Sequence, residues 1–343
     1  MRTTWKACVR GAVVILLLAG ISDFAANDDP YHLRPVLQGE PPAERTWLEP
    51  AIEKVATLNQ SDEYILYTPE VATLGPEGSV LVYDFGEHQL KAFAPDGTYL
   101  RTYGNGQGMG PGEVLQLRYG GVWQDSLVFL VDGMQRQVNL FDLEGQLLET
   151  ESYPEGVLQY VRGADGTRFV RLSSPSPEMP LLEMHTPDAV RQVPRFSTDP
   201  PDTRIWHDGW LNVHGDRALH VALYAPVILA YSADDTVGTA HPTPDFGGPF
   251  HGTPTRTGEG IYHAWSQVDG DALSTQLWTK KGLPATDPMP DSLFFDIYDA
   301  TDVSYRYSAR FAVTGHHAMY APESGLLVAV QDTTVELYRL TNE

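Results

Sequence analysis

Val80-Leu-Val-Tyr-Asp84 and Val128-Phe-Leu-Val-Asp132 are two apolar runs that end in an aspartate and are followed by the same pattern. Counted from the first aspartate, offsets +6, +9, +13 and +16 hold Leu90, Phe93, Gly97 and Leu100. The same offsets in the second copy hold Val138, Phe141, Gly145 and Leu148, and the aspartates stand 48 positions apart. Self-similarity at a period of about 20 to 50 residues indicates a repeat architecture.

Each copy of the pattern predicts four short β-strands. Runs rich in Val, Leu, Tyr and Phe alternate with turn pairs such as Pro95-Asp-Gly97 and Glu144-Gly145. The first copy predicts strands at Val71–Leu74, Val80–Asp84, Leu90–Phe93 and Tyr99–Tyr103. The second predicts strands at Leu117–Trp123, Leu127–Asp132, Gln137–Asp142 and Leu147–Ser152. Four antiparallel strands per repeat are typical of one propeller blade.

Later repeats keep the strand rhythm but lose most of the signature residues. We expect a third repeat over Val157–Val193, a fourth around Ala218–Tyr231, a fifth over Gly260–Val313, and a sixth that ends near Tyr338. Six units of 48 residues need 288, and about 290 residues follow the N-terminal arm. The sequence therefore predicts an all-β fold, a six-bladed β-propeller of four-stranded antiparallel blades over residues 46–343. Seven blades, with the fifth repeat split, is the alternative.

The N-terminal segment is predicted to close the ring. The sixth repeat stops after its third strand, whereas the strand-like segment Trp47–Leu58 precedes the first repeat and has no blade of its own. If that segment completes the last blade, the ring has only short, protected edges. Residues Asn27–Arg45 are expected to form an arm on the surface.

The first 26 residues are typical of an export signal. Three basic residues precede or flank the apolar run Ala12–Ala19, and a small residue suitable for cleavage stands at Ala26. The run is shorter than the roughly 18 to 20 residues of a membrane span. We therefore expect a protein exported to the periplasm or the extracellular space, with no stable membrane insertion after cleavage; an uncleaved signal-anchor is the alternative. The one cysteine, Cys8, precedes the run, so the mature chain would have no disulfide.

Two motifs in the first repeats carry a family resemblance. One is the glycine loop Gly104-Asn-Gly-Gln-Gly-Met-Gly-Pro-Gly-Glu113, and the other is Leu127–Asp132 followed by Gln135-Arg-Gln-Val138 and Phe141. They resemble the Gly-x-Gly-Pro-Gly-Glu/Gln-Phe loop and the blade core of NHL-type six-bladed propellers, although Val114 stands where that family favours Phe. The resemblance covers Val71–Leu148, extends to exported bacterial six-bladed propellers, and implies a fold rather than an activity.

The negative charge of the chain disfavours nucleic acid as a partner. The formal net charge is −22, so we expect no nucleic-acid partner, because phosphate contacts need a basic face.

Asp84 and Asp132 are expected to accept hydrogen bonds from loop N–H groups, with a ring of carboxylates round calcium as the alternative. Asp296, Asp299 and Asp302 are expected in an exposed acidic turn.

Three histidines fall at blade spacing. His207, His263 and His316 are separated by 56 and 53 residues, and each is expected near the start of an inner strand. Three imidazoles that converge on the axis would hold zinc with an open coordination position. The amidating lyases, a related propeller family, are built in that general way. The alternative is accidental spacing among eleven histidines. Our leading expectation is no cofactor, with zinc or calcium as the alternative.

Aromatic residues accompany these histidines and define the predicted ligand site. Trp210 and Trp265 lie close to them in sequence, and Arg118 takes the matching position in the second blade. The predicted ligand-binding residues are Arg118, His207, Trp210, His263, Trp265 and His316. Because no His-Glu-x-x-His or Gly-x-Ser-x-Gly motif is present, we predict a non-enzymatic module that binds a protein, peptide or glycan on one face. The alternative is a metal-dependent lyase or lactonase-like hydrolase with its site on the axis.

Overall fold

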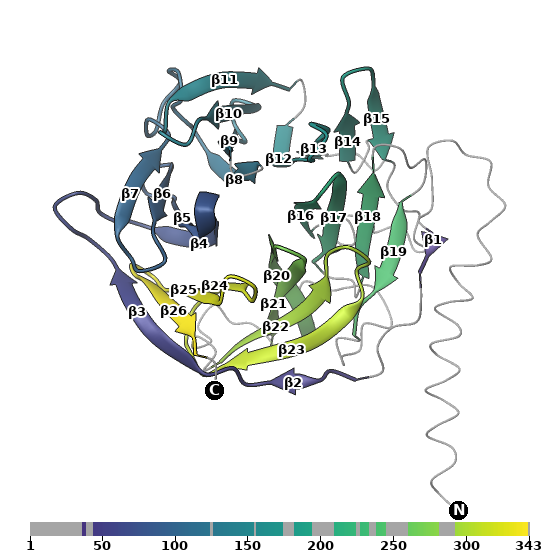
Figure 1. Cartoon of the computed structure of the whole chain (residues 1–343). Coiled ribbons are helices and arrows are strands. Elements are labelled where there is room, and N and C mark those ends of the chain that lie inside the picture. Colours follow the sequence, from purple (N-terminus) through teal and green to yellow (C-terminus); the bar gives the residue numbers. More distant parts are fainter. Residues whose placement is uncertain are drawn as a thin grey trace, which may run out of the picture.

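The computed structural model describes residues 36–38, 44–123, 126–153, 156–173, 182–193, 209–223, 227–232, 238–244, 260–280 and 292–341. These residues form six small sheets arranged in a ring (Figure 1), and their only helical element is one 3-10 turn, Pro76–Gly78. The prediction of an all-β, six-bladed propeller is confirmed, and the seven-bladed alternative is wrong. The predicted export signal lies outside the described residues.

Blades 1 and 2 have the strands that the repeat predicts. Blade 1 contains β4 (Pro69–Leu74), β5 (Val80–Asp84), β6 (Gln89–Phe93) and β7 (Tyr99–Tyr103). Blade 2 contains β8 (Leu117–Trp123), β9 (Leu127–Asp132), β10 (Gln137–Phe141) and β11 (Leu147–Ser152). Every residue of β5 is buried, because a blade packs against a neighbour on each face. This is why the second strands are continuous apolar runs rather than alternating ones.

The glycine of the repeat serves the turn between the third and fourth strands. Gly97 and Gly145 both have a φ of 89°, a left-handed conformation that L side chains rarely adopt. A Cβ atom at Gly97 would also lie 2.4 Å from the Cβ atom of Ala56 in the neighbouring sixth blade. The +13 glycine is therefore required by both backbone conformation and blade packing.

The later blades follow the same plan with less regular strands. Blade 3 contains β12 (Gly156–Arg162), β13 (Arg168–Ser173), β14 (Leu182–His185) and β15 (Val190–Val193). Blade 4 contains β16 (Gly209–His214), β17 (Arg217–Ala222), β18 (Val227–Ser232) and β19 (Thr239–Pro242). Blade 5 contains β20 (Gly260–Asp269), β21 (Ala272–Lys280), β22 (Leu293–Asp299) and β23 (Tyr305–Phe311). Blade 6 contains β24 (His317–Ala321), β25 (Leu326–Val330) and β26 (Val335–Leu340).

An N-terminal strand closes the ring, as predicted. Strand β3 (Ile52–Leu58) pairs antiparallel with β26 and becomes the outer strand of blade 6. The rest of the predicted strand differs, because β2 (Trp47–Leu48) pairs in parallel with β23 of blade 5. Strand β1 (Val36–Leu37) likewise pairs in parallel with β19 of blade 4. The N-terminal segment thus runs along the outer edges of three successive blades (Figure 1) and covers strand edges that would otherwise be exposed.

A buried ion pair fixes this segment to blade 5. The Arg45 guanidinium donates from Nε to Asp296 Oδ1 at 2.9 Å and from Nη2 to Asp296 Oδ2 at 3.0 Å. The Asp296 side chain is 0% exposed and also accepts a hydrogen bond of 2.6 Å from Ser308 Oγ. The expectation that Asp296 lies in an exposed turn is therefore wrong, because a strand of blade 5 and the N-terminal segment enclose it. Asp299 and Asp302 do lie at the β22–β23 turn.

The repeated aspartates hold loops together, as predicted. Asp132 accepts backbone N–H hydrogen bonds from Leu115 and Gln116 of the loop that enters blade 2, at 2.6 and 3.3 Å. It also accepts them from Met134 and Gln135 of its own turn, at 2.8 and 2.9 Å. Asp84 makes the equivalent contacts in blade 1. In each of blades 1 and 2, one carboxylate therefore satisfies backbone donors from two loops that would otherwise be buried without partners.

We expect Arg45→Ala to lower the free energy of unfolding by about 3 to 5 kcal/mol, because it leaves the Asp296 carboxylate buried and unpaired. Chemical denaturation measures the change. Arg310→Ala is the matched control, since its ion pair with Glu49 is exposed on both sides and should be worth about 1 kcal/mol or less. Equal stabilities of the two variants would contradict the role of Arg45.

We expect Asp132→Ala to lower the free energy of unfolding by about 3 kcal/mol or more, because it removes the acceptor of several buried N–H groups at once. Asp132→Asn, which keeps one side-chain oxygen, should lose less. Asp142→Ala is the control, because Asp142 accepts one backbone hydrogen bond in an exposed turn. A loss for Asp132→Ala no larger than for this control would show that the loops do not depend on the carboxylate.

Candidate functional site

The six inner strands all begin at the same face of the ring. Each blade has four antiparallel strands, so the chain returns to one face before it enters the next inner strand. We call this the start face; it carries the first residues of the inner strands, Pro69, Leu117, Gly156, Gly209, Gly260 and His317. The loops that enter each blade and the turns between second and third strands lie on this face, as the topology requires.

Trp265 closes the axis near the start face. Its ring comes from β20 of blade 5 and lies 6.0 Å, centroid to centroid, from Tyr119 of blade 2 on the opposite side of the ring. It also contacts Tyr83 of blade 1 at 6.3 Å, Trp210 of blade 4 at 4.5 Å and His317 of blade 6 at 5.0 Å. A side chain that contacts both the neighbouring and the opposite blades has to cross the centre. The axis is therefore filled by aromatic and imidazole rings at this level, with Trp265 only 4% exposed.

Hydrogen bonds between blades make the surroundings of the axis rigid. The Gln159 Oε1 atom of blade 3 accepts from Leu211 N of blade 4 at 3.1 Å, and Gln276 Oε1 of blade 5 accepts from Ala318 N of blade 6 at 2.9 Å. Asn212 donates from Nδ2 to Ser266 Oγ at 2.6 Å between blades 4 and 5. These buried amides tie successive blades together through their oxygen atoms or, for Asn212, its amide nitrogen, whereas Gln159 Nε2 and Gln276 Nε2 have no hydrogen-bond partner among the described residues.

The structure brings together two of the predicted ligand residues and places two more at the same face. Trp210 and Trp265 contact each other at the axis. Arg118 is exposed at a β-bulge of β8, where the register shifts between Leu117 and Tyr119. Its side chain lies across Gly133, where a Cβ atom would be 2.5 Å from Arg118 Cγ. His316 is half-buried just before β24, and burial lowers its pKa.

The predicted three-histidine centre remains a prediction. His207 lies outside the described residues, and of His263 only the backbone, paired with Leu277 in blade 5, is described. Within the ranges that the structure describes, no group of three or more His, Cys, Asp or Glu side chains is placed to hold a metal ion. The expectations about zinc, calcium and the absence of a cofactor all stay open.

Among the described side chains, His317, which sequence reasoning missed, is a histidine that contacts an axial ring, that of Trp265. It is 6% exposed, and neither ring nitrogen has a hydrogen-bond partner among the described residues. Burial, with a smaller effect from His316, lowers the pKa of His317 to about 3, so the ring is neutral at physiological pH. Neighbouring residues of a strand point to opposite sides. A prediction that misplaces the start of this strand by one residue therefore selects His316 instead of His317 as the residue that faces the axis.

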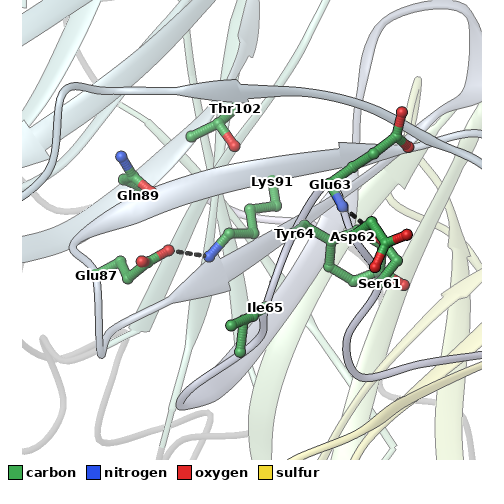
Figure 2. Close-up of a pocket in the computed structure, with 9 residues that line it drawn as sticks. All are labelled: Ser61, Asp62, Glu63, Tyr64, Ile65, Glu87, Gln89, Lys91 and Thr102. Atoms are coloured by element: carbon green, nitrogen blue, oxygen red, sulfur yellow. Dashed lines mark hydrogen bonds and ion pairs between the residues drawn. The ribbon is translucent and has the colours of Figure 1, made fainter.

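A second candidate site is a cleft of about 390 Å³ at the rim of the start face (Figure 2). It lies between the loop that joins β3 to β4 and the β5–β6 turn, and it is lined by Ser61, Asp62, Glu63, Tyr64, Ile65, Glu87, Gln89, Lys91 and Thr102. At its base Lys91 Nζ lies 2.5 Å from both Asp84 Oδ2 and Glu87 Oε2. Burial raises the pKa of Asp84, but hydrogen bonds from Lys91, Thr68 and Tyr67 outweigh this and lower it overall.

The sequence contained a signal for this cleft that we did not use. Three and seven positions after the repeated aspartate, blade 2 has the neutral pair Gln135 and Asn139. Blade 1 has the charged pair Glu87 and Lys91 at the same offsets, and Lys91 is 2% exposed. A buried lysine in an otherwise apolar strand is rare and is usually paired. This difference between the two most regular repeats therefore indicates that blade 1 has a charged group that blade 2 lacks.

Comparisons with known proteins support the fold and no narrower assignment. No protein-family model and no curated protein matches the chain. Among solved structures, the chain is similar to a protein of Bacteroides fragilis NCTC 9343 that is described as an exported protein. The two share 11% identity with a TM-score of 0.56, and the comparison covers 90% of this chain and 99% of that chain. A member of the duf4221 family from Bacteroides vulgatus ATCC 8482 has 8% identity and a TM-score of 0.57, with 86% and 100% covered.

A third similar structure is virginiamycin B lyase from Staphylococcus aureus, with 11% identity, a TM-score of 0.50, and 85% of this chain and 100% of that chain covered. Likeness at such identities reflects the shared fold and does not transfer an activity. The six-bladed part of the resemblance in the first two repeats is confirmed, whereas membership of the NHL family is not shown.

We expect the stability of the protein to fall as the pH is lowered from about 6.5 towards 4, in part because His317 stays neutral while the same histidine in the unfolded chain takes up a proton. A group with a lowered folded-state pKa of about 3 contributes a slope of up to about 1.4 kcal/mol per pH unit in this interval. His317→Gln should reduce the slope of the unmodified protein. Unfolding free energies measured across this pH range test the prediction, and an unchanged slope in His317→Gln would contradict it.

Proposed function

We propose that this protein is an exported binding propeller that recognises a protein, peptide or glycan on its start face. The observation that carries the proposal is Trp265, whose ring crosses the centre and contacts rings of blades 1, 2, 4 and 6. With the axis filled at this level, a ligand has to be recognised at the surface of the disc. A rigid scaffold that presents loops on one face is well suited to that task.

Export is supported by a fold comparison and by the N-terminal sequence. The chain has the fold of a protein described as exported, over 90% of its length. Among the described residues, no helix combines the length and the apolar character needed to cross a membrane. The apolar run Ala12–Ala19, which the sequence analysis interprets as the core of an export signal, would direct the chain to the periplasm or beyond.

The start face carries side chains suited to recognition. Four large apolar side chains are exposed in its loops over blades 1 and 2: Ile65, Tyr67, Met109 and Met134, at 42, 54, 76 and 64%. Arg118 is exposed beside them, and Trp210 is partly buried nearer the axis. Aromatic, methionine and arginine side chains are enriched at protein interfaces. The face therefore offers apolar anchors and a cation for an anionic group of the ligand.

An axial lyase or hydrolase is less well supported. Such an enzyme needs a site on the axis that substrate can reach, and the rings around Trp265 occupy that position. His317, which among the described side chains contacts Trp265, has a pKa of about 3 and accepts protons poorly at neutral pH.

Arrays of peptides and glycans, probed with the purified exported protein, test the proposal. We expect a ligand whose affinity falls tenfold or more in Trp210→Ala or Arg118→Ala, because anchor residues dominate binding energy. Trp123→Ala and Arg162→Ala are matched controls, since these two side chains stack on each other at 4.0 Å at the opposite end of the inner strands. No ligand on any array, or equal losses in the controls, would contradict recognition on the start face.

A further inference from the structure

The cleft of Figure 2 points to the chemistry of the partner, and this inference rests on the proposed binding function. We propose that the cleft receives a basic side chain, arginine or lysine, from a peptide segment or a protein partner. The cleft lies on the start face and is lined by Ile65, one of the exposed apolar residues of that face, so it belongs to the same recognition surface.

The charge of the cleft is the first argument. Asp62, Glu63 and Glu87 line it, Asp84 lies beneath it, and Lys91 is the one basic residue among its lining residues. Four carboxylates against one ammonium leave a formal charge of −3. The Lys91 side chain is 3% exposed and already paired with Asp84 and Glu87, so it is not available to an anionic ligand. The structure gives Asp62 and Glu63 no ion-pair partner among the described residues.

The walls and the size of the cleft are the second argument. The Tyr64 ring is held by stacking on Tyr99 at 5.3 Å and by an edge contact with Phe93 at 4.9 Å. Together with Ile65 it offers a fixed apolar wall for the methylene groups of a long side chain. A volume of about 390 Å³ is near the lower end of ligand pockets, which span roughly 300 to 1,000 Å³. One side chain with its adjoining backbone fits this volume better than a large ligand does.

A compact metal ion fits the cleft less well than an extended cation. No three of the described carboxylates, here or elsewhere in the described chain, are close enough together to hold a metal. Carboxylates spread along the two sides of a cleft instead match the several N–H donors of a guanidinium or ammonium group. Burial raises the pKa of Tyr64, so this wall of the cleft adds no charge.

The experiment compares two capped pentapeptides, Ala-Leu-Arg-Leu-Ala and the same peptide with citrulline in place of arginine, each carrying an uncharged fluorophore. Citrulline keeps the shape of arginine and removes its charge. In fluorescence anisotropy at low salt we expect the arginine peptide to bind at least tenfold more tightly. The double variant Asp62→Asn/Glu63→Gln should lose roughly fivefold in affinity for it, as expected for two exposed charges.

The control is Glu53→Gln/Glu77→Gln, which removes the same number of exposed negative charges away from the cleft. It should bind the arginine peptide as the unmodified protein does. The inference is wrong if the arginine peptide does not bind, if both peptides bind equally, or if the control loses as much affinity as the double variant. A ligand from the arrays that depends on Trp210 but not on Asp62 and Glu63 would overturn the cleft alone and leave the proposed function standing.

Discussion

The antiparallel pairing of β3 with β26 is the contact on which the rest of this structure depends. It joins the two ends of the chain, with Lys54 Nζ 2.5 Å from Glu336 Oε1 across 282 positions of sequence. A blade buries its faces only against its neighbours, so blade 1 lacks one cover until blade 6 is complete. One hydrophobic cluster contains Val80 and Phe93 of blade 1 together with Met319 and Leu337 of blade 6. Closure therefore converts six small sheets, each marginal by itself, into one ring with a continuous interior.

Closure also determines where recognition can take place. Six inner strands brought round one axis leave little room, and here the space near the start face holds Trp265 and the rings that it contacts. Side-chain amides such as Gln159 and Gln276 then bind backbone N–H groups of the next blade and stiffen the centre. The groups free to meet a partner lie on loops at the face and at the rim. The proposed binding surface and the acidic cleft both follow from this division between a filled centre and an exposed face.

Sequence reasoning succeeded where the determinants are local. In blades 1 and 2 the third strand lies between a repeated aspartate and a repeated glycine, and both residues perform the expected turn functions. The predictions failed where the surroundings of a residue depend on segments far away in the sequence. Asp296 was expected in a turn and is buried by Arg45, 251 positions away. At the axis, a displacement of one residue separated the predicted His316 from His317, which contacts Trp265. Of the predicted ligand residues, Trp210 and Trp265 do meet, because both lie on inner strands.

The sequence by itself determined the class of fold, the number of blades and the closing strand. These follow from apolar periodicity, turn residues and the length of the chain, all of which are local or additive properties. Only the tertiary structure decided which side chains meet: the rings around Trp265, the Arg45–Asp296 pair, and the acidic cleft around Lys91. The physical reason is that these contacts join side chains from segments far apart in the chain. Their relative positions are set by the packing of whole blades, which no short stretch of sequence contains.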